Sequence, residues 1–115
     1  MTAIERDLWV LMAEVATDAA NRSKLTEGAS RVSTSMVSGL EAIVTDLSSR
    51  FELPTEFVVP GQDRLSALLD LARTIVRRAE RASVAIAEDG SQISPYLTRL
   101  SSVLWTLARW VEGEP

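Results

Sequence analysis

Apolar residues recur along most of this chain at the three- and four-residue spacing that places them on one face of an α-helix. The clearest stretch covers residues 65–86, and its apolar or small positions are Leu65, Leu68, Leu69, Ala72, Ile75, Val76, Ala79, Ser83 and Ile86. Asp63 is placed to cap the start of this helix, and Gly90 is placed as its C′ residue. The pattern therefore predicts a long amphipathic helix from Asp63 to about Asp89.

Three other stretches have the same spacing. They predict helices over about Thr2–Asp18, Ser33–Phe51 and Ser94–Val111. Thr2 begins a capping box, Ser33 has the position of an N-cap, and Ser94 precedes a proline at the first helical position. Residues 19–31 have no sustained period and predict a loop, whereas residues 57–59 predict a short extended segment and residues 112–115 a frayed tail.

Four amphipathic helices without a strand candidate predict an all-α protein. We expect an up-down helical bundle of four helices, in a single domain that spans residues 1–115. The polar positions of the last helix include a separate flank formed by Thr98, Ser102, Trp105 and Arg109. The chain contains no P-loop and no Gly-x-Gly-x-x-Gly motif, so the common phosphate-binding loops are not indicated.

Composition narrows the function further. With 12 basic and 16 acidic residues, the net charge of −4 argues against general nucleic-acid binding. The absence of Cys and His removes thiolate ligands and the commonest general base, and no metal site is predicted. No apolar run reaches the length of a membrane span, and the N-terminus lacks the pattern of a leader peptide. These features predict a cytoplasmic protein without a membrane partner.

One polar strip of the third predicted helix contains stacked arginines. Arg73, Arg77 and Arg81 recur every fourth residue, and like charges at that spacing oppose each other by roughly 0.2–0.5 kcal/mol per pair. Asp70 and Glu80 lie three residues from Arg73 and Arg77 and are expected to compensate part of this charge. A bound polyphosphate would supply the rest, because the guanidinium fork matches phosphate oxygens. The alternative is a solvated basic face, and the spacing alone leaves both interpretations open.

Several motifs together resemble the PduO-type ATP:corrinoid adenosyltransferases. They are Phe57-Val-Val-Pro60-Gly61, Arg73-Thr-Ile-Val-Arg77-Arg78-Ala-Glu80-Arg81, Tyr96-Leu-Thr98-Arg-Leu-Ser101 and Leu107-Ala-Arg109. The resemblance implies a transferase that moves the 5′-deoxyadenosyl group of ATP to the cobalt of reduced cobalamin. ATP with Mg²⁺ and cobalamin are then the substrates. Because the cobalt is itself the nucleophile, the resemblance requires no protein His or Cys.

The resemblance also assigns roles to residues by position. It implies catalytic roles for Arg73 and Arg77, and places at the nucleotide Arg73, Arg77, Arg78, Glu80, Arg81 and Thr98. It places Phe57 and Trp105 at the corrinoid. The family is a five-helix bundle that forms trimers with active sites between subunits. Relative to that pattern, this chain starts within what would be the second helix, after the family's glycine-rich nucleotide loop. We therefore expect weak ATP–Mg²⁺ binding by this chain alone.

Individual positions also depart from the family pattern. Asp70 stands where the family has histidine, Thr98 where it has asparagine, and Ser102 where it has aspartate. Three functions stay open at this point. The first is an adenosyltransferase that keeps activity, alone or with its missing segment supplied by a second chain. The second is a non-catalytic subunit that binds nucleotide or corrinoid, or that regulates a complete relative by joining its trimer. The third is a structural remnant.

Large apolar residues outside the main stripes predict assembly. Trp9, Val10, Trp105 and Trp110 lie off the core faces of their helices, and such groups rarely stay together in water. We expect a homo-oligomer, and the resemblance implies a trimer.

Overall fold

In a computed structural model of the chain, the structure describes residues 2–17, 24–26, 28–29, 31–50, 64–85 and 91–113. Within these ranges the protein has four α-helices and no other long element. They are α1 (Thr2–Ala16), α2 (Thr34–Arg50), α3 (Arg64–Ser83) and α4 (Ile93–Gly113). The predicted all-α fold of four helices is confirmed.

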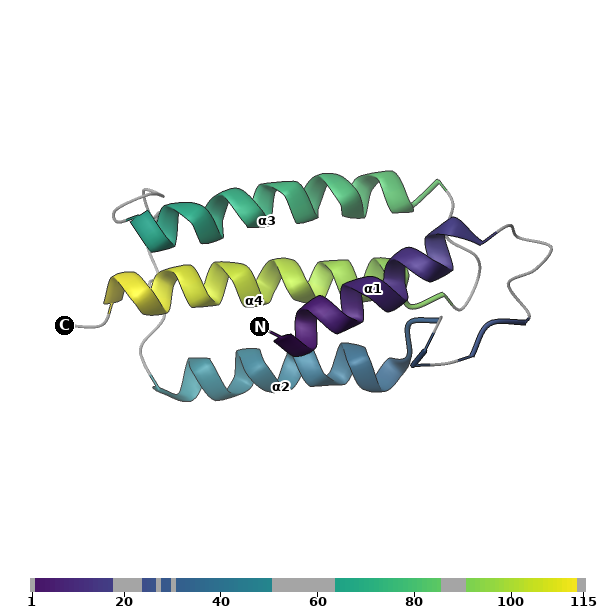
Figure 1. The fold of residues 1–115 in the computed structure, drawn as a ribbon. Coiled ribbons are helices and arrows are strands. Elements are labelled where there is room, and N and C mark those ends of the chain that lie inside the picture. The colour runs from purple at the N-terminus through teal and green to yellow at the C-terminus, as the bar shows by residue number, and fades with distance from the viewer. Residues whose placement is uncertain are drawn as a thin grey trace.

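Helix α4 lies at the centre of the molecule. Figure 1 shows α3 and α2 on opposite sides of α4, while α1 crosses α4 obliquely. Because α4 has neighbours on several sides, it is buried nearly all round and supplies much of the core. Its buried apolar residues are Ile93, Tyr96, Leu97, Leu100, Val103, Leu104 and Ala108. Residues from α1 and α2, such as Ile4, Leu11 and Leu40, complete the same cluster.

Helix α3 packs on α4 through a narrower face than the sequence predicts. Leu69, Ala72 and Val76 contact the core, and the small residues Ser66 and Ser83 are buried. Four residues of the predicted stripe are instead exposed, namely Leu65, Leu68, Ile75 and Ala79. The physical reason is position, because α3 lies at the edge of the bundle and α4 covers only part of its wide apolar stripe.

The predicted helix starts are partly right. The Ser33 hydroxyl accepts a hydrogen bond from the backbone N–H of Met36 at 3.3 Å, which confirms Ser33 as N-cap of α2. Helix α4 begins earlier than predicted, because Ser91 Oγ accepts from the N–H of Ile93 at 3.3 Å. Ser94 therefore lies inside the first turn, where its hydroxyl is 2.9 Å from that of Ser83.

The C-terminal ends predicted for the last two helices differ from the ends in the structure. Helix α3 ends at Ser83, whose hydroxyl donates to the carbonyl of Glu80 at 2.8 Å and so competes with continued helical bonding. The predicted end near Asp89 lies outside the described residues. Helix α4 continues to Gly113, so residue 112 is not part of a frayed tail. Glu112 is instead held by an ion pair with Arg109.

Polar contacts hold α1 on the rest of the bundle. The buried Glu14 carboxylate accepts hydrogen bonds from the backbone N–H of Val32 at 2.8 Å and the hydroxyl of Ser91 at 3.0 Å. The Tyr96 hydroxyl donates to Asp7 at 2.9 Å. These contacts join α1 to the segments that lead into α2 and α4 and, through Tyr96, to α4 itself. In the described part of the chain, none of the helices has the length and apolar character needed to cross a membrane.

Candidate functional site

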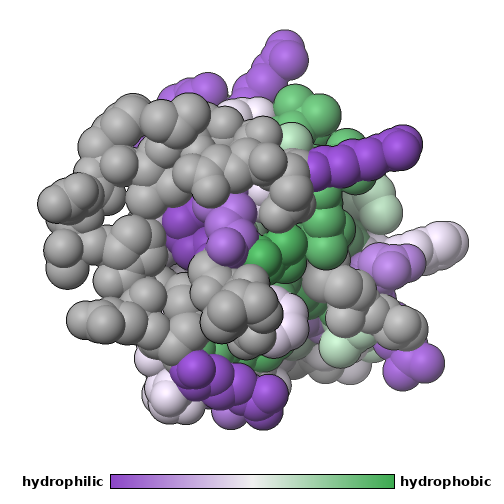
Figure 2. Space-filling model, turned by 90° about the vertical axis from the view of Figure 1, so that its left-hand side faces the viewer, coloured by the Kyte–Doolittle hydropathy of each residue, from purple (hydrophilic) through white to green (hydrophobic). Residues whose placement is uncertain are grey.

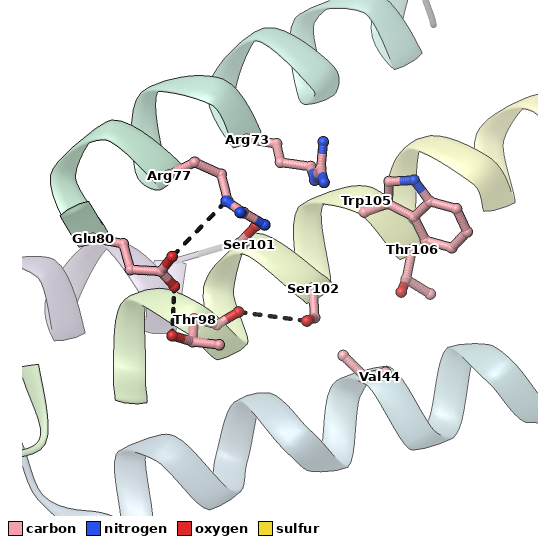
Figure 3. Close-up of a pocket in the computed structure, with 9 residues that line it drawn as sticks. All are labelled: Val44, Arg73, Arg77, Glu80, Thr98, Ser101, Ser102, Trp105 and Thr106. Carbon is pink, nitrogen blue, oxygen red and sulfur yellow. Dashed lines mark hydrogen bonds and ion pairs between the residues drawn. The ribbon is translucent and has the colours of Figure 1, made fainter. Parts of the chain in front are cut away.

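A pocket of about 380 Å³ opens between α2, α3 and α4. Figure 3 shows that α3 and α4 provide most of its walls and that α2 provides one apolar side chain. The lining residues are Val44, Arg73, Arg77, Glu80, Thr98, Ser101, Ser102, Trp105 and Thr106. The pocket therefore combines two guanidinium groups, several hydroxyl groups and one indole ring.

Arg73 and Arg77 supply the positive charge of the pocket. They lie one turn apart on α3, and both side chains extend toward the pocket in Figure 3. Arg73 is half-buried and makes no ion pair or hydrogen bond with another described residue. Arg77 Nε lies 3.8 Å from the Glu80 carboxylate, which confirms the predicted compensation by Glu80. Much of the charge of Arg73 is thus available to an anion.

Glu80 and Thr98 connect the two principal walls. The Thr98 hydroxyl, on α4, donates a hydrogen bond to Glu80 Oε2, on α3. Ser102 lies one turn beyond Thr98 on α4 and its hydroxyl contacts the Thr98 carbonyl at 3.4 Å. The carboxylate is therefore oriented from both sides, by a hydroxyl and by the guanidinium of Arg77.

The predicted pairing of Asp70 with Arg73 is wrong. Asp70 Oδ2 instead accepts a hydrogen bond from Arg109 Nη2 at 2.6 Å. Arg109 is only 4% exposed, and a buried guanidinium requires carboxylate partners to offset its lost hydration. Packing of α3 on α4 brings Asp70 to this group, so Asp70 does not compensate Arg73.

The other proposed site residues have different surroundings. Trp105 lines the pocket, and its ring centroid lies 5.5 Å from Arg109 Cζ. Arg78 and Arg81 are exposed on α3 and do not line the pocket. Arg78 follows Arg77 by one residue, so it lies about 100° further round the helix. Phe57 lies outside the described residues. The roles that the resemblance assigns to these residues stay predictions.

Sequence reasoning found part of this pocket and missed the rest. Thr98, Ser102 and Trp105 belong to the polar flank that the spacing of the last helix indicates. Ser101 and Thr106 were not expected in the site. Ser101 belongs to a motif of the resemblance but received no role there, and Thr106 is a buried polar residue without a sequence signal of its own. Val44 has no sequence signal that marks it as a site residue, because the contact of α2 with this pocket depends on packing.

Fold and site together define a helical-bundle protein with an arginine-lined pocket that has an indole ring in its wall. Residues 1–111 match the family model described as cobalamin adenosyltransferase. The chain is 32% identical, over 98% of its length, to the corrinoid adenosyltransferase of Citrobacter freundii, and 33% identical, over 95%, to the corrinoid adenosyltransferase PduO of Salmonella typhimurium. It is 39% identical, over 69% of its length, to the corrinoid adenosyltransferase of Mycobacterium tuberculosis. The chain belongs to the cobalamin adenosyltransferase family.

The chain is shorter than these relatives. It spans 64% of the length of the Citrobacter freundii protein, 32% of the Salmonella typhimurium protein and 44% of the Mycobacterium tuberculosis protein. The activity, substrates and partners of the whole relatives are therefore considered for this chain as proposals.

Proposed function

We propose that this protein is a corrinoid adenosyltransferase, which transfers the 5′-deoxyadenosyl group of ATP to the cobalt of reduced cobalamin. The observation that carries this proposal is the pairing of Arg73 and Arg77 in one pocket whose wall also contains Trp105. Family membership supports the same assignment. Guanidinium groups suit a triphosphate, and an aromatic wall suits a large apolar ring system.

The reaction requires charge stabilisation more than a protein nucleophile. The reduced cobalt attacks C5′ of ATP, the bond between C5′ and its oxygen breaks, and triphosphate leaves with the electron pair. Arg73 and Arg77 are proposed to bind that leaving group and to stabilise the charge that develops on it. Arg73 is suited to this role because it has no anionic partner among the described residues. Glu80 is proposed to orient Arg77, from which its carboxylate lies 3.8 Å.

Other parts of the proposal lie beyond the pocket. We propose that Arg78 and Arg81 contact nucleotide outside it, and that Mg²⁺ arrives as part of the ATP substrate. Among the described residues, no three His, Cys, Asp or Glu side chains come together as a metal site. Phe57 stays the predicted corrinoid contact, and the cytoplasm stays the predicted location.

Assembly is the second part of the proposal. We propose a homo-oligomer, with a trimer as the expected form. Large apolar side chains are exposed on two helices, including Trp9 and Met12 of α1 and Leu68, Leu71 and Ile75 of α3. Figure 2 shows apolar surface gathered on the side of the molecule where α1 lies in Figure 1. A second copy, or a chain that carries a glycine-rich nucleotide loop, would cover this surface.

A non-catalytic subunit that binds nucleotide or corrinoid and associates with a complete relative is the alternative function. The hydrogen bond between Thr98 and Glu80 favours this alternative, because these two polar groups of the pocket bond each other and are then not available to a substrate. The deciding assay combines the purified chain with ATP, Mg²⁺ and reduced cobalamin, with and without a chain that carries the nucleotide loop. Formation of adenosylcobalamin supports the enzyme. Binding of ATP or cobalamin without turnover, together with mixed oligomers, supports the subunit.

A further inference from the structure

A second charged group, behind the pocket, is more deeply buried than the pocket arginines. The Arg109 guanidinium is 4% exposed and lies between two carboxylates. Asp70 of α3 accepts from Nη2 at 2.6 Å, and Glu112 of α4 accepts from Nε at 2.9 Å. The side chains of Asp70 and Glu112 are themselves 14% and 8% exposed. All three groups are therefore largely withdrawn from water.

This arrangement fixes the plane of the guanidinium. The N–H donors of Nη2 and Nε lie in that plane and bond two different carboxylates, so acceptors on two helices restrict rotation about the last bonds of the side chain. Asp70 sets the plane relative to α3, and Glu112 sets it relative to α4. Each bond is charge-assisted and lies where water competes little.

Trp105 lies against this fixed group. It precedes Arg109 by four residues, which puts both side chains on the same face of α4. The Arg109 Cζ atom is 5.5 Å from the ring centroid, within the range of a cation–π contact. Trp105 is only partly buried, so core packing alone does not fix its rotamer. Figure 3 shows the ring in the pocket wall beside the Arg73 guanidinium.

We propose that Asp70, Arg109 and Glu112 are positioning residues that hold the Trp105 indole as a fixed wall of the pocket. The consequence for ligands rests on the proposed function. A fixed indole presents a flat surface to a corrinoid, whereas Arg73 and Arg77 bind phosphate independently of it. Loss of the Asp70 charge is then expected to affect corrinoid binding much more than phosphate binding.

The direct test follows the ring itself. The chain has three tryptophans, so protein labelled with 5-fluorotryptophan gives three fluorine resonances, which single Trp→Phe variants assign. Asp70→Asn keeps the size of the side chain and removes its charge. We expect it to shift or broaden the Trp105 resonance and to leave that of exposed Trp9 unchanged. Arg109→Lys is expected to do the same, because an ammonium cannot bond in the same fork.

Two controls separate positioning from general destabilisation. Asp46→Asn makes the same chemical change at an exposed ion pair with Arg50 and is expected to leave the Trp105 resonance in place. Leu40→Ala removes a buried core side chain of α2, leaves Asp70, Arg109 and Glu112 unchanged, and is also expected to leave the Trp105 resonance in place. An unchanged Trp105 resonance in folded Asp70→Asn protein, or an equal change in Leu40→Ala, overturns the proposal.

Ligand titrations distinguish this inference from the proposed function. With cob(II)alamin as probe, Asp70→Asn is expected to weaken binding about fivefold through the loosened indole. With tripolyphosphate as probe, the affinity of Asp70→Asn should stay within about twofold of that of wild type. Equal weakening for both probes overturns the positioning role. If wild-type protein binds neither probe, the proposed function fails, and the fluorine spectra still decide whether the cluster positions Trp105.

Discussion

Glu80 of α3 accepts a hydrogen bond from the Thr98 hydroxyl of α4, and its other carboxylate oxygen lies 3.8 Å from Arg77. This carboxylate therefore joins the two walls of the pocket. It also places a negative charge next to the two arginines that are proposed to bind phosphate. An anion in the pocket meets attraction from Arg73 and Arg77 and repulsion from Glu80.

Removing the Glu80 charge should strengthen phosphate binding. Glu80→Gln keeps an oxygen that accepts from Thr98 and removes a negative charge beside the ligand. We expect the affinity for tripolyphosphate to rise by about 0.5–1 kcal/mol, the size of a partly exposed ion pair. Calorimetric titration at low salt measures this change. Weaker binding in Glu80→Gln would show that orientation of Arg77 by the carboxylate matters more than repulsion.

Arg77 should be needed for phosphate binding in the same assay. Arg77→Ala is expected to weaken tripolyphosphate binding by roughly 1.5–3 kcal/mol, the range for hydrogen bonds to charged groups. Arg77→Lys should also be impaired, because an ammonium cannot bind two phosphate oxygens in a fixed fork. The matched control is Arg64→Ala, since Arg64 is exposed on the same helix and does not line the pocket.

A solvated arginine face predicts a different result. In that case Arg77→Ala changes folding stability by only a few tenths of a kcal/mol, through relief of like-charge repulsion. Equal tripolyphosphate affinities for wild type, Arg77→Ala and Arg77→Lys would remove the phosphate site from this pocket. An effect of Arg64→Ala equal to that of Arg77→Ala would point to general charge attraction.

Glu14 should contribute strongly to folding stability. Its carboxylate is 2% exposed and accepts from Val32 and Ser91, so truncation leaves two donors without their acceptor. We expect Glu14→Ala to lower the free energy of unfolding by about 2–4 kcal/mol. Urea denaturation measures it, with Arg6→Ala, an exposed position of the same helix, as control. A loss equal to that of the control would mean that these bonds contribute little.

Tyr96 should make stability depend on alkaline pH. Burial raises the pKa of its hydroxyl, and the hydrogen bond to Asp7 and the negative charge of Asp7 raise it further. The folded state therefore holds this proton more tightly than the unfolded chain, where the pKa is about 10. The stabilisation is complete below about pH 10 and falls as the pH rises above that value.

Tyr96→Phe separates this effect from other alkaline titrations. Its free energy of unfolding should lose the part of the pH dependence above about pH 10 that wild type shows. Because Tyr96 is the single tyrosine, the ultraviolet absorbance of tyrosinate should appear together with unfolding. Tyrosinate formation in protein that is still folded, at the pH expected for free tyrosine, would contradict the prediction.

The exposed apolar face should mediate self-association. Trp9 is 75% exposed and Ile75 is 60% exposed. Burial of these side chains in an interface would stabilise the oligomer by roughly 25 cal/mol for each Å² of apolar surface removed from water. We expect Trp9→Glu and Ile75→Glu to raise the dissociation constant of the oligomer by about tenfold or more. Analytical sedimentation measures this, with Thr45→Glu, on the exposed side of α2, as control. Monomeric wild-type protein at micromolar concentration would refute the oligomer.

The sequence by itself determined the four helices and their amphipathic character. Helical period and capping are local properties, because they depend on residues three or four positions apart. The spacing therefore predicted four helices, the cap at Ser33 and the polar flank of α4 that lines the pocket. The ion pair between Arg77 and Glu80 was also predictable, because both residues lie on one helix at a spacing of three.

Only the tertiary structure decided which groups from different helices meet. Asp70 has Arg73 as a local neighbour, yet it pairs with Arg109, because a fully buried guanidinium needs a carboxylate partner more than a half-buried one does. Leu68 and Ile75 fit the periodic stripe but are exposed, because α3 has α4 on one side only. Glu14 has no local sign of its role, since its partners lie on segments distant in sequence. Partners of this kind are set by how helices pack, and no periodic pattern within one helix records that.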